Sequence, residues 1–144
     1  MRNPWKKLLA NVKSTANVKK HRRTVRSDGT IPSLPDDFVQ TRVEIDDVFL
    51  EQLFGKQNGR CHWFPEIELD PMLLFVSKHP MAISVDRLVS KVTETEGHYT
   101  KDNVVLTTRF ANFGRCSYDG DFDKEVVQVI QECIRNPKPL GILL

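Results

Sequence analysis

This chain has few cysteines and no long apolar run. These two features argue against a disulfide-rich protein and against a membrane-spanning one. The 144 residues include three cysteines, none of which belongs to a C-x-x-C pair, so a four-cysteine zinc site is excluded. A sparse, odd set of cysteines is typical of a reducing compartment rather than of a disulfide framework. No apolar run approaches the roughly 20 residues of a membrane span. We therefore expect an intracellular, cytoplasmic protein without membrane contact.

Acidic residues are missing from residues 1–26, which carry nine lysines and arginines, whereas the remainder of the chain is net acidic. This asymmetry predicts a basic arm that contacts a polyanion, and nucleic acid is the leading candidate. The alternative is a solvated tail that only increases solubility. The residues of the arm that we expect to contact DNA are Lys19, Lys20, Arg22, Arg23 and Arg26.

Hydrophobic periodicity predicts an α+β protein with helices around a small β core. Forty per cent hydrophobic residues suffice for such a core. Helical spacing predicts one helix after the Asn3-Pro4 cap, and another after Asp46 or Asp47 that ends at Asn58-Gly59. A further amphipathic helix is predicted over residues 122–134. We divide the chain into a basic N-terminal helix and arm, residues 1–40, and a folded domain, residues 41–144.

The central part of the chain alternates apolar and polar residues as half-buried strands do. Residues 82–88, AISVDRL, predict one strand and residues 104–108 a second, with a polar loop over 91–102 between them. Residues 109–115 predict a short helix, and residues 41–45, TRVEI, predict a brief additional strand. The resulting order is strand, long loop, strand, helix.

Two ordered blocks of residues give this region a family resemblance. The first block consists of SVDRL on the first strand and GHYTKDNVVL around the start of the second. The other block is the upstream segment LEQLFGKQNGRCHWFPEIEL. Together they resemble the ββα-metal core of the HNH endonuclease superfamily, in its phage and restriction variety, over about residues 43–118. The resemblance implies an HNH-like fold and cleavage of DNA by a free-standing enzyme of the homing or restriction kind.

The chain departs from the family pattern at two places. Arg87 stands where the family usually has the histidine of an Asp-His pair. Some members also hold a structural zinc with four cysteines. Of these four positions only Cys61 is a cysteine here, and the other three are occupied by Phe64, Thr108 and Ala111. We therefore expect no structural zinc, and a core that is held together by packing alone.

The resemblance also implies roles for individual residues. Asp86 and Asn112 are implied as ligands of Mg²⁺ or Mn²⁺, and carboxylate and amide oxygens suit these hard cations. Asn103 is implied to bond the loop backbone and so to set the shape of the loop. Arg87 cannot act as a base, since a guanidinium stays protonated, but it can bind the scissile phosphate and stabilise its charge.

The general base must then be another residue, and two candidates lie in the loop. His98 titrates near neutral pH without assistance. Tyr99 needs its pKa of about 10 lowered, and a neighbouring cation such as Arg87 can have that effect. Some rare-cutting members of the superfamily combine the Asp-Arg pair with a tyrosine in this loop, which favours Tyr99 by resemblance. Both candidates stay open, with His21 and His62 as more distant options.

The sequence thus predicts a metal-dependent endonuclease that acts on double-stranded DNA, with Arg109 and Arg115 as further contacts to the DNA backbone. A symmetric target would imply a homodimer. The Asp-Arg replacement keeps a second hypothesis open, in which the chain is a catalytically inactive HNH-fold module that binds DNA. A third hypothesis, an RNA-binding protein without catalysis, depends on the basic arm alone.

Overall fold

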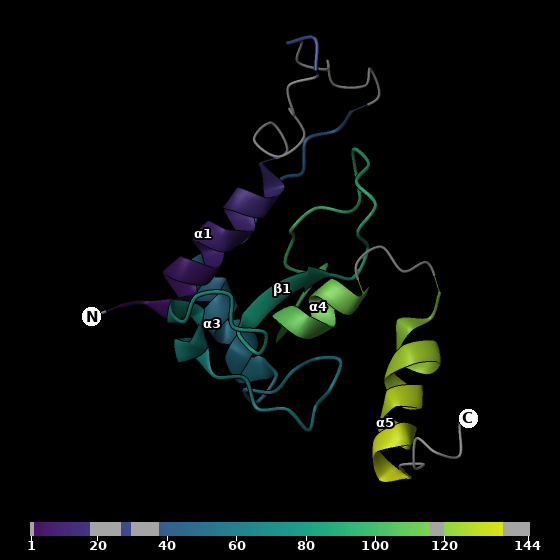
Figure 1. Cartoon of the computed structure of the whole chain (residues 1–144). Helices are drawn as coiled ribbons and strands as arrows, with labels where there is room; N and C mark the ends of the chain where they lie inside the picture. The colour runs from purple at the N-terminus through teal and green to yellow at the C-terminus, as the bar shows by residue number, and fades with distance from the viewer. Residues whose placement is uncertain (1, 18–26, 30–37, 116–119, 137–144) are drawn as a thin grey trace.

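The chain folds into a mixed arrangement of helices and strands, which is the α+β class that the sequence predicts (Figure 1). The computed structural model describes residues 2–17, 27–29, 38–115 and 120–136. In chain order the elements are α1 (Pro4–Ala16), α3 (Asp47–Lys56), the 3₁₀ helix η1 (Pro71–Phe75), β1 (Ile83–Arg87), β2 (Val104–Thr108), α4 (Arg109–Arg115), the π-helical turn η2 (Asp123–Val127) and α5 (Gln128–Arg135).

The two N-terminal helices begin at the caps that the sequence indicates. The side chain of Asn3 accepts hydrogen bonds from the backbone N–H groups of Trp5 and Lys6, at 2.9 and 3.2 Å, and Pro4 occupies the first helical position. Asp46 caps α3 in the same way, by accepting from the N–H of Phe49 at 2.7 Å. These side chains satisfy N–H groups that have no partner within the helix, so each helix has a defined start.

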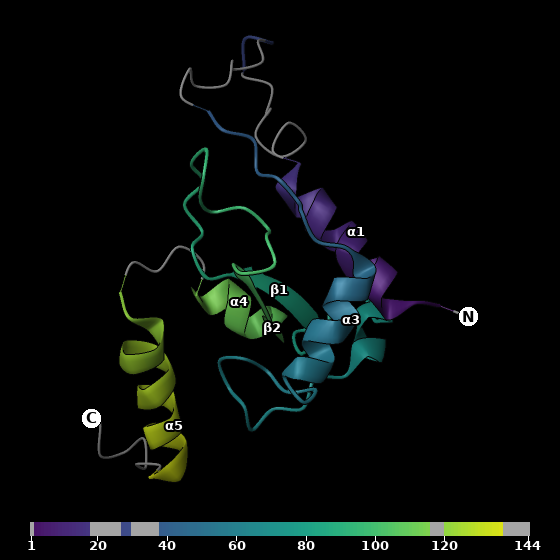
Figure 2. The ribbon, with the colours of Figure 1, turned by 180° about the vertical axis from the view of Figure 1, so that it is seen from behind.

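β1 and β2 form an antiparallel pair in which Ile83 lies opposite Thr108 and Arg87 opposite Val104. Among the described residues this sheet has two strands, and α4 follows β2 directly, so the predicted order of strand, loop, strand and helix is confirmed. Successive side chains of a strand point to opposite faces. In both views β1 lies between α1 on one side and α4 on the other (Figures 1 and 2).

Helix α1 belongs to the main core rather than to a separate arm. Its residues Trp5, Leu8 and Val12 are buried in the same cluster as Ile83 and Leu106 of the sheet. The boundary that we expected at residue 40 therefore does not separate α1 from the rest in packing. The reason is that the apolar stripe of α1 finds its partners on α3, η1 and β1. The basic cluster over residues 19–26 lies outside the described residues.

Two further predictions are confirmed only in part. Residues 41–45 do not form a regular strand, and Val43 makes a single parallel bridge to Tyr99 instead. The C-terminal helix predicted over 122–134 is present as η2 followed by α5, so its first turn is wider than an α-helix. Phe122, just before this turn, packs edge-on against Trp63 with ring centroids 5.1 Å apart.

Within the part of the chain that the structure describes, every helix falls short of the length and apolarity that crossing a membrane requires.

The packing of α1 leads to a prediction about stability. Leu8 is 1% exposed, so Leu8→Ala should leave a cavity and lower the free energy of unfolding by about 2–5 kcal/mol. The exposed Lys6 on the same helix provides the control. Lys6→Ala should change the free energy of unfolding by no more than about 0.5 kcal/mol. Urea denaturation followed by circular dichroism measures both. If Leu8→Ala leaves the main transition unchanged, α1 folds independently of the sheet.

Candidate functional site

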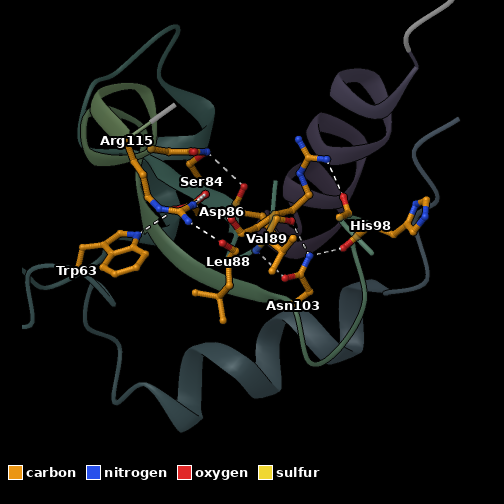
Figure 3. Close-up of polar contacts among 12 residues, drawn as sticks. Trp63, Ser84, Asp86, Leu88, Val89, His98, Asn103 and Arg115 are labelled. Carbon is orange, nitrogen blue, oxygen red and sulfur yellow. Dashed lines mark hydrogen bonds and ion pairs between the residues drawn. The ribbon is translucent and has the colours of Figure 1, made fainter. Parts of the chain in front are cut away.

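Asp86 lies at the end of β1 and is buried, with 4% of its surface exposed. Both of its carboxylate oxygens accept hydrogen bonds: Oδ1 from Nη1 of Arg115 at 2.8 Å, and Oδ2 from Nε1 of Trp63 at 2.8 Å (Figure 3). Each oxygen keeps a second lone pair after accepting one bond. Trp63 gives no signal of this role in the sequence, because it is 23 residues away from Asp86 and resembles an ordinary packing residue.

Arg115, the last residue of α4, points inward rather than toward solvent. Besides its bond to Asp86, its guanidinium donates from Nη1 to the carbonyl of Arg87 at 2.6 Å and from Nη2 to the carbonyl of Leu88 at 2.7 Å. The group also lies over the ring of Trp63, 5.1 Å from the centroid. Its side chain is only 11% exposed. In this conformation the protein's own acceptors engage the guanidinium, and contact of Arg115 with the DNA backbone stays a prediction.

Asn112 faces β1 from one turn earlier on α4. Its Nδ2 donates to the hydroxyl of Ser84 at 2.7 Å and more weakly to the carbonyl of Val85 at 3.3 Å. Its Oδ1 accepts no hydrogen bond from the described residues, so the amide oxygen is left for another partner. The spacing of three residues between Asn112 and Arg115 puts both on the face of α4 that packs on β1.

A groove runs along β1 between α1 and α4. Two adjoining cavities of about 450 and 800 Å³ form it, and Ser84, Val85, Tyr99 and Asn112 are among the residues that line both. We call this hollow the β1 groove. Five basic residues line it: Lys7, Lys78, Arg87, Lys91 and Arg109.

Asp86 is the single carboxylate among the described residues that line the β1 groove. The excess of positive charge suits a polyanion such as a phosphodiester backbone. Arg109, which we expected to contact DNA, lies in this lining and is exposed. Lys78 and Lys91 were missed by sequence analysis, because they are isolated lysines in loops and only the folded chain brings them to the groove.

Arg87 and Tyr99 contact each other on the groove. The guanidinium of Arg87 lies 4.9 Å from the centroid of the Tyr99 ring, and its Nη1 donates to the carbonyl of Gly97 at 2.8 Å. Tyr99 is 4% exposed. Burial raises the pKa of Tyr99 above its ordinary value, and the charge of Arg87 only partly offsets this effect. Arg87 therefore does not bring about the lowered pKa that Tyr99 would need as a base at neutral pH.

His98 is not available as a general base, which corrects one of our two candidates. The side chain is 1% exposed, and both of its ring nitrogens have backbone partners. Nδ1 accepts from the N–H of Arg42 at 3.0 Å, and Nε2 lies 2.6 Å from the carbonyl oxygen of Thr93. In Figure 3 the ring of His98 points away from Asp86. His98 therefore joins two segments of backbone and has no lone pair directed at the groove.

Asn103 forms the loop contacts that we expected of it. Its Oδ1 accepts from the N–H of Val89 at 2.8 Å, and its Nδ2 donates to the carbonyls of Val89 and His98, both at 2.9 Å (Figure 3). One side chain thus joins the end of β1 to the far end of the loop. The contribution of Asn103 to any reaction stays a prediction.

His62 lies beside this site on the side of Trp63. Its ring packs edge-on against the Trp63 ring, with centroids 4.7 Å apart. The side chain is exposed, yet partial desolvation by its neighbours lowers the pKa of His62, while the charges of Asp86 and Asp123 raise it to a smaller extent. His62 is not among the residues that line the β1 groove. His21 lies outside the described residues, as do the arm residues Lys19, Lys20, Arg22, Arg23 and Arg26.

The oxygen donors of the groove fit a divalent cation. Asp86 offers a carboxylate and Asn112 an amide oxygen, they come from facing elements, and both line the β1 groove. Mg²⁺ is commonly bound by one or two such oxygens, with waters and substrate phosphates as the other ligands. The described residues contain no cluster of three or more His, Cys, Asp or Glu side chains that could hold a metal by themselves. A cation at this position would therefore depend on ligands from water and substrate.

The comparisons with known proteins add no family assignment. No family model, no curated protein and no solved structure matches the chain significantly.

The loop that carries the Arg87 contact generates a prediction about stability. Gly97 has φ +82°, and a Cβ there would overlap the carbonyl of Lys91 and come within 2.7 Å of the Val92 Cα. Gly97→Ala should therefore lower the free energy of unfolding by at least about 2 kcal/mol.

Gly55 in the last turn of α3 is the matched control, because a Cβ there meets nothing within 4 Å. Gly55→Ala should raise the free energy of unfolding by about 0.5–1 kcal/mol. Denaturant titration of both variants against the parent is the measurement. Equal effects of the two substitutions would contradict the loop geometry described above.

Proposed function

We propose that the chain is an HNH-type, metal-dependent endonuclease that hydrolyses phosphodiester bonds of double-stranded DNA. The observation that carries the proposal is the β1 groove, in which Asp86, Arg87 and Asn112 meet among four further basic residues. The resemblance assigns Asp86 and Asn112 to the metal, and Arg87, which replaces the family's usual histidine, can bind the phosphate. The three side chains line one groove of a strand, loop, strand and helix unit, and this shared position supports the resemblance more than any single residue does.

DNA would lie along the β1 groove with a phosphate close to Arg87. The exposed lysines and Arg109 on the groove neutralise the neighbouring phosphates, which holds the duplex without reading its sequence. The guanidinium of Arg87 has donors left after its bond to Gly97. These donors can bind the scissile phosphate and stabilise the negative charge that grows in the transition state.

Asp86 and Asn112 would hold Mg²⁺ or Mn²⁺ through their side-chain oxygens. When bound, the cation supplies positive charge to the phosphate and to the departing oxygen. Trp63 orients the carboxylate through its bond to Oδ2, and Ser84 orients the amide of Asn112 through its hydroxyl. These contacts orient the two side chains before a cation arrives.

Tyr99 is the residue that we assign as the general base. It lines the β1 groove and contacts Arg87, whereas His98 is buried among backbone groups. Because burial raises the pKa of Tyr99, only a small fraction of the phenol is ionised at neutral pH. The reaction should accordingly be slow near pH 7 and faster in alkaline solution.

A catalytically inactive DNA-binding module is the second candidate function. The observation in its favour is the ion pair between Asp86 and Arg115, because a carboxylate already neutralised by an arginine needs no metal ion. Such a protein would use the same basic groove for DNA but would not cleave it. Incubation of supercoiled plasmid with Mg²⁺ or Mn²⁺, and separately with chelator, distinguishes the two functions.

The metal role of Asp86 leads to the main functional prediction. Asp86→Asn should lower the rate of plasmid nicking at least about 10³-fold, since charge stabilisation by a metal is worth several kcal/mol and each 1.36 kcal/mol is tenfold in rate. Binding of a duplex oligonucleotide, measured by fluorescence anisotropy, should persist.

Glu68 provides the matched control, because it is also paired with an arginine but is exposed and lies outside the lining of the groove. Glu68→Gln should nick plasmid at the parental rate. Thermal melts of both variants separate loss of chemistry from loss of the fold. A folded Asp86→Asn protein that still cleaves at the parental rate would remove Asp86 from the reaction.

The assignment of Tyr99 leads to a prediction about pH. Its ordinary pKa is 10.0 and burial raises it, so the ionised fraction and the rate should rise about tenfold per pH unit from pH 7 to 9.5. Tyr99→Phe keeps the ring under Arg87 but removes the hydroxyl, and it should lower the rate by about 10²–10⁴. Single-turnover nicking across this pH range is the measurement. A profile already flat above pH 7 would instead identify a base of low pKa such as His62.

A further inference from the structure

The guanidinium of Arg115 occupies a position where three oxygen atoms converge. Asp86 Oδ1, the carbonyl oxygen of Arg87 and that of Leu88 all accept bonds from it, at 2.8, 2.6 and 2.7 Å (Figure 3). Carboxylate and backbone carbonyl oxygens are also the ligands that hard divalent cations take in proteins. The end of β1 therefore presents an oxygen-lined position for a cation, and in this structure an organic cation fills it.

This arrangement leaves one donor of Arg115 unsatisfied. Its Nε is buried and has no hydrogen-bond partner among the residues that the structure describes, in contrast to its two terminal nitrogens. A buried donor without an acceptor is unfavourable, so the position binds the guanidinium less well than the three contacts suggest. Arg115 is also the last residue of α4, where a change in its side chain disturbs the fewest helical neighbours.

A divalent cation on Asp86 would lie close to the positive charge of Arg115. Like charges a few ångströms apart in a partly buried site repel strongly, because little solvent lies between them to screen the interaction. The cation and the guanidinium also need the same oxygen, Oδ1, or at least the same carboxylate. Binding of one therefore weakens binding of the other.

We infer that Arg115 competes with the divalent cation for Asp86 and thereby keeps the metal affinity of the free protein low. This inference rests on the proposed function and adds to it a residue that controls when the metal binds. Phosphates of bound DNA offer Arg115 another partner and give the cation further oxygen ligands. Metal binding and DNA binding are then coupled, and each strengthens the other by the same factor.

The experiment measures Mn²⁺ binding without DNA, by following the electron paramagnetic resonance signal of free Mn²⁺. Arg115→Gln removes the competing charge, so its Mn²⁺ dissociation constant should be at least tenfold lower than that of the parent. Asp86→Asn introduced into Arg115→Gln should abolish this gain. Mn²⁺ should also raise the melting temperature of Arg115→Gln more than that of the parent.

Arg109→Gln is the matched control, because Arg109 lies on the same helix and on the groove but makes no side-chain hydrogen bond to another described residue. It removes the same charge from α4 without touching Asp86, and its Mn²⁺ dissociation constant should stay within about threefold of the parent's. The inference would be overturned if the Arg115→Gln variant bound Mn²⁺ no more tightly than the Arg109→Gln variant.

A measurement on the parent protein covers the case in which Arg115→Gln does not fold. The Nε–H resonance of Arg115 in a nitrogen-15 spectrum should shift on titration with Mg²⁺, while that of Arg109 stays in place. An unmoved Arg115 resonance at saturating Mg²⁺ would overturn the inference. None of these measurements uses DNA, so a negative result contradicts the competition but does not bear on plasmid cleavage. Conversely, a parent protein that never cleaves plasmid would contradict the proposed function but not the competition between Arg115 and the cation.

Discussion

The buried carboxylate of Asp86 is the constraint on which the rest of the site depends. A charge with so little exposure must be paired and hydrogen-bonded, and Arg115 and Trp63 fulfil this need from two different parts of the chain. Because Arg115 ends α4 and Trp63 follows α3, the same contacts hold both segments against β1. Removing one partner from such a buried pair typically costs about 3–5 kcal/mol. The stability of the fold and the geometry of the site are therefore coupled.

The alternation of side chains along β1 separates packing from chemistry. Ile83 and Val85 enter the core with α1, whereas the side chains of Ser84 and Asp86 bond to residues of α4. Arg87, the last residue of the strand, reaches the loop and contacts Tyr99. A five-residue strand thus supplies residues to the core, to the proposed metal site and to the proposed phosphate contact. The loop keeps its shape because Asn103 and His98 satisfy its backbone groups from within.

The local parts of this site could be predicted, and the environment of each side chain could not. The order of elements and the caps at Asn3 and Asp46 depend on neighbours close in sequence, and the loop contacts of Asn103 were expected from the family resemblance. The contacts of His98 could not be predicted, because its Nδ1 accepts from the backbone of Arg42, which is 56 residues away. The raised pKa of Tyr99 could not be predicted for the same reason, since the effect of burial exceeds that of Arg87.

By itself, the sequence determined which residues form strands and helices around the Asp-Arg pair, because hydrophobic period and capping are local properties. It also determined the types of chemical group available: one carboxylate, two amides and a guanidinium at set intervals. Only the tertiary structure decided which of these groups face one another. It turned Arg115 inward to Asp86, buried His98, and gathered Lys78 and Lys91 on the β1 groove. The physical reason is that burial and pairing arise from contacts between distant segments, which exist only once the core has formed.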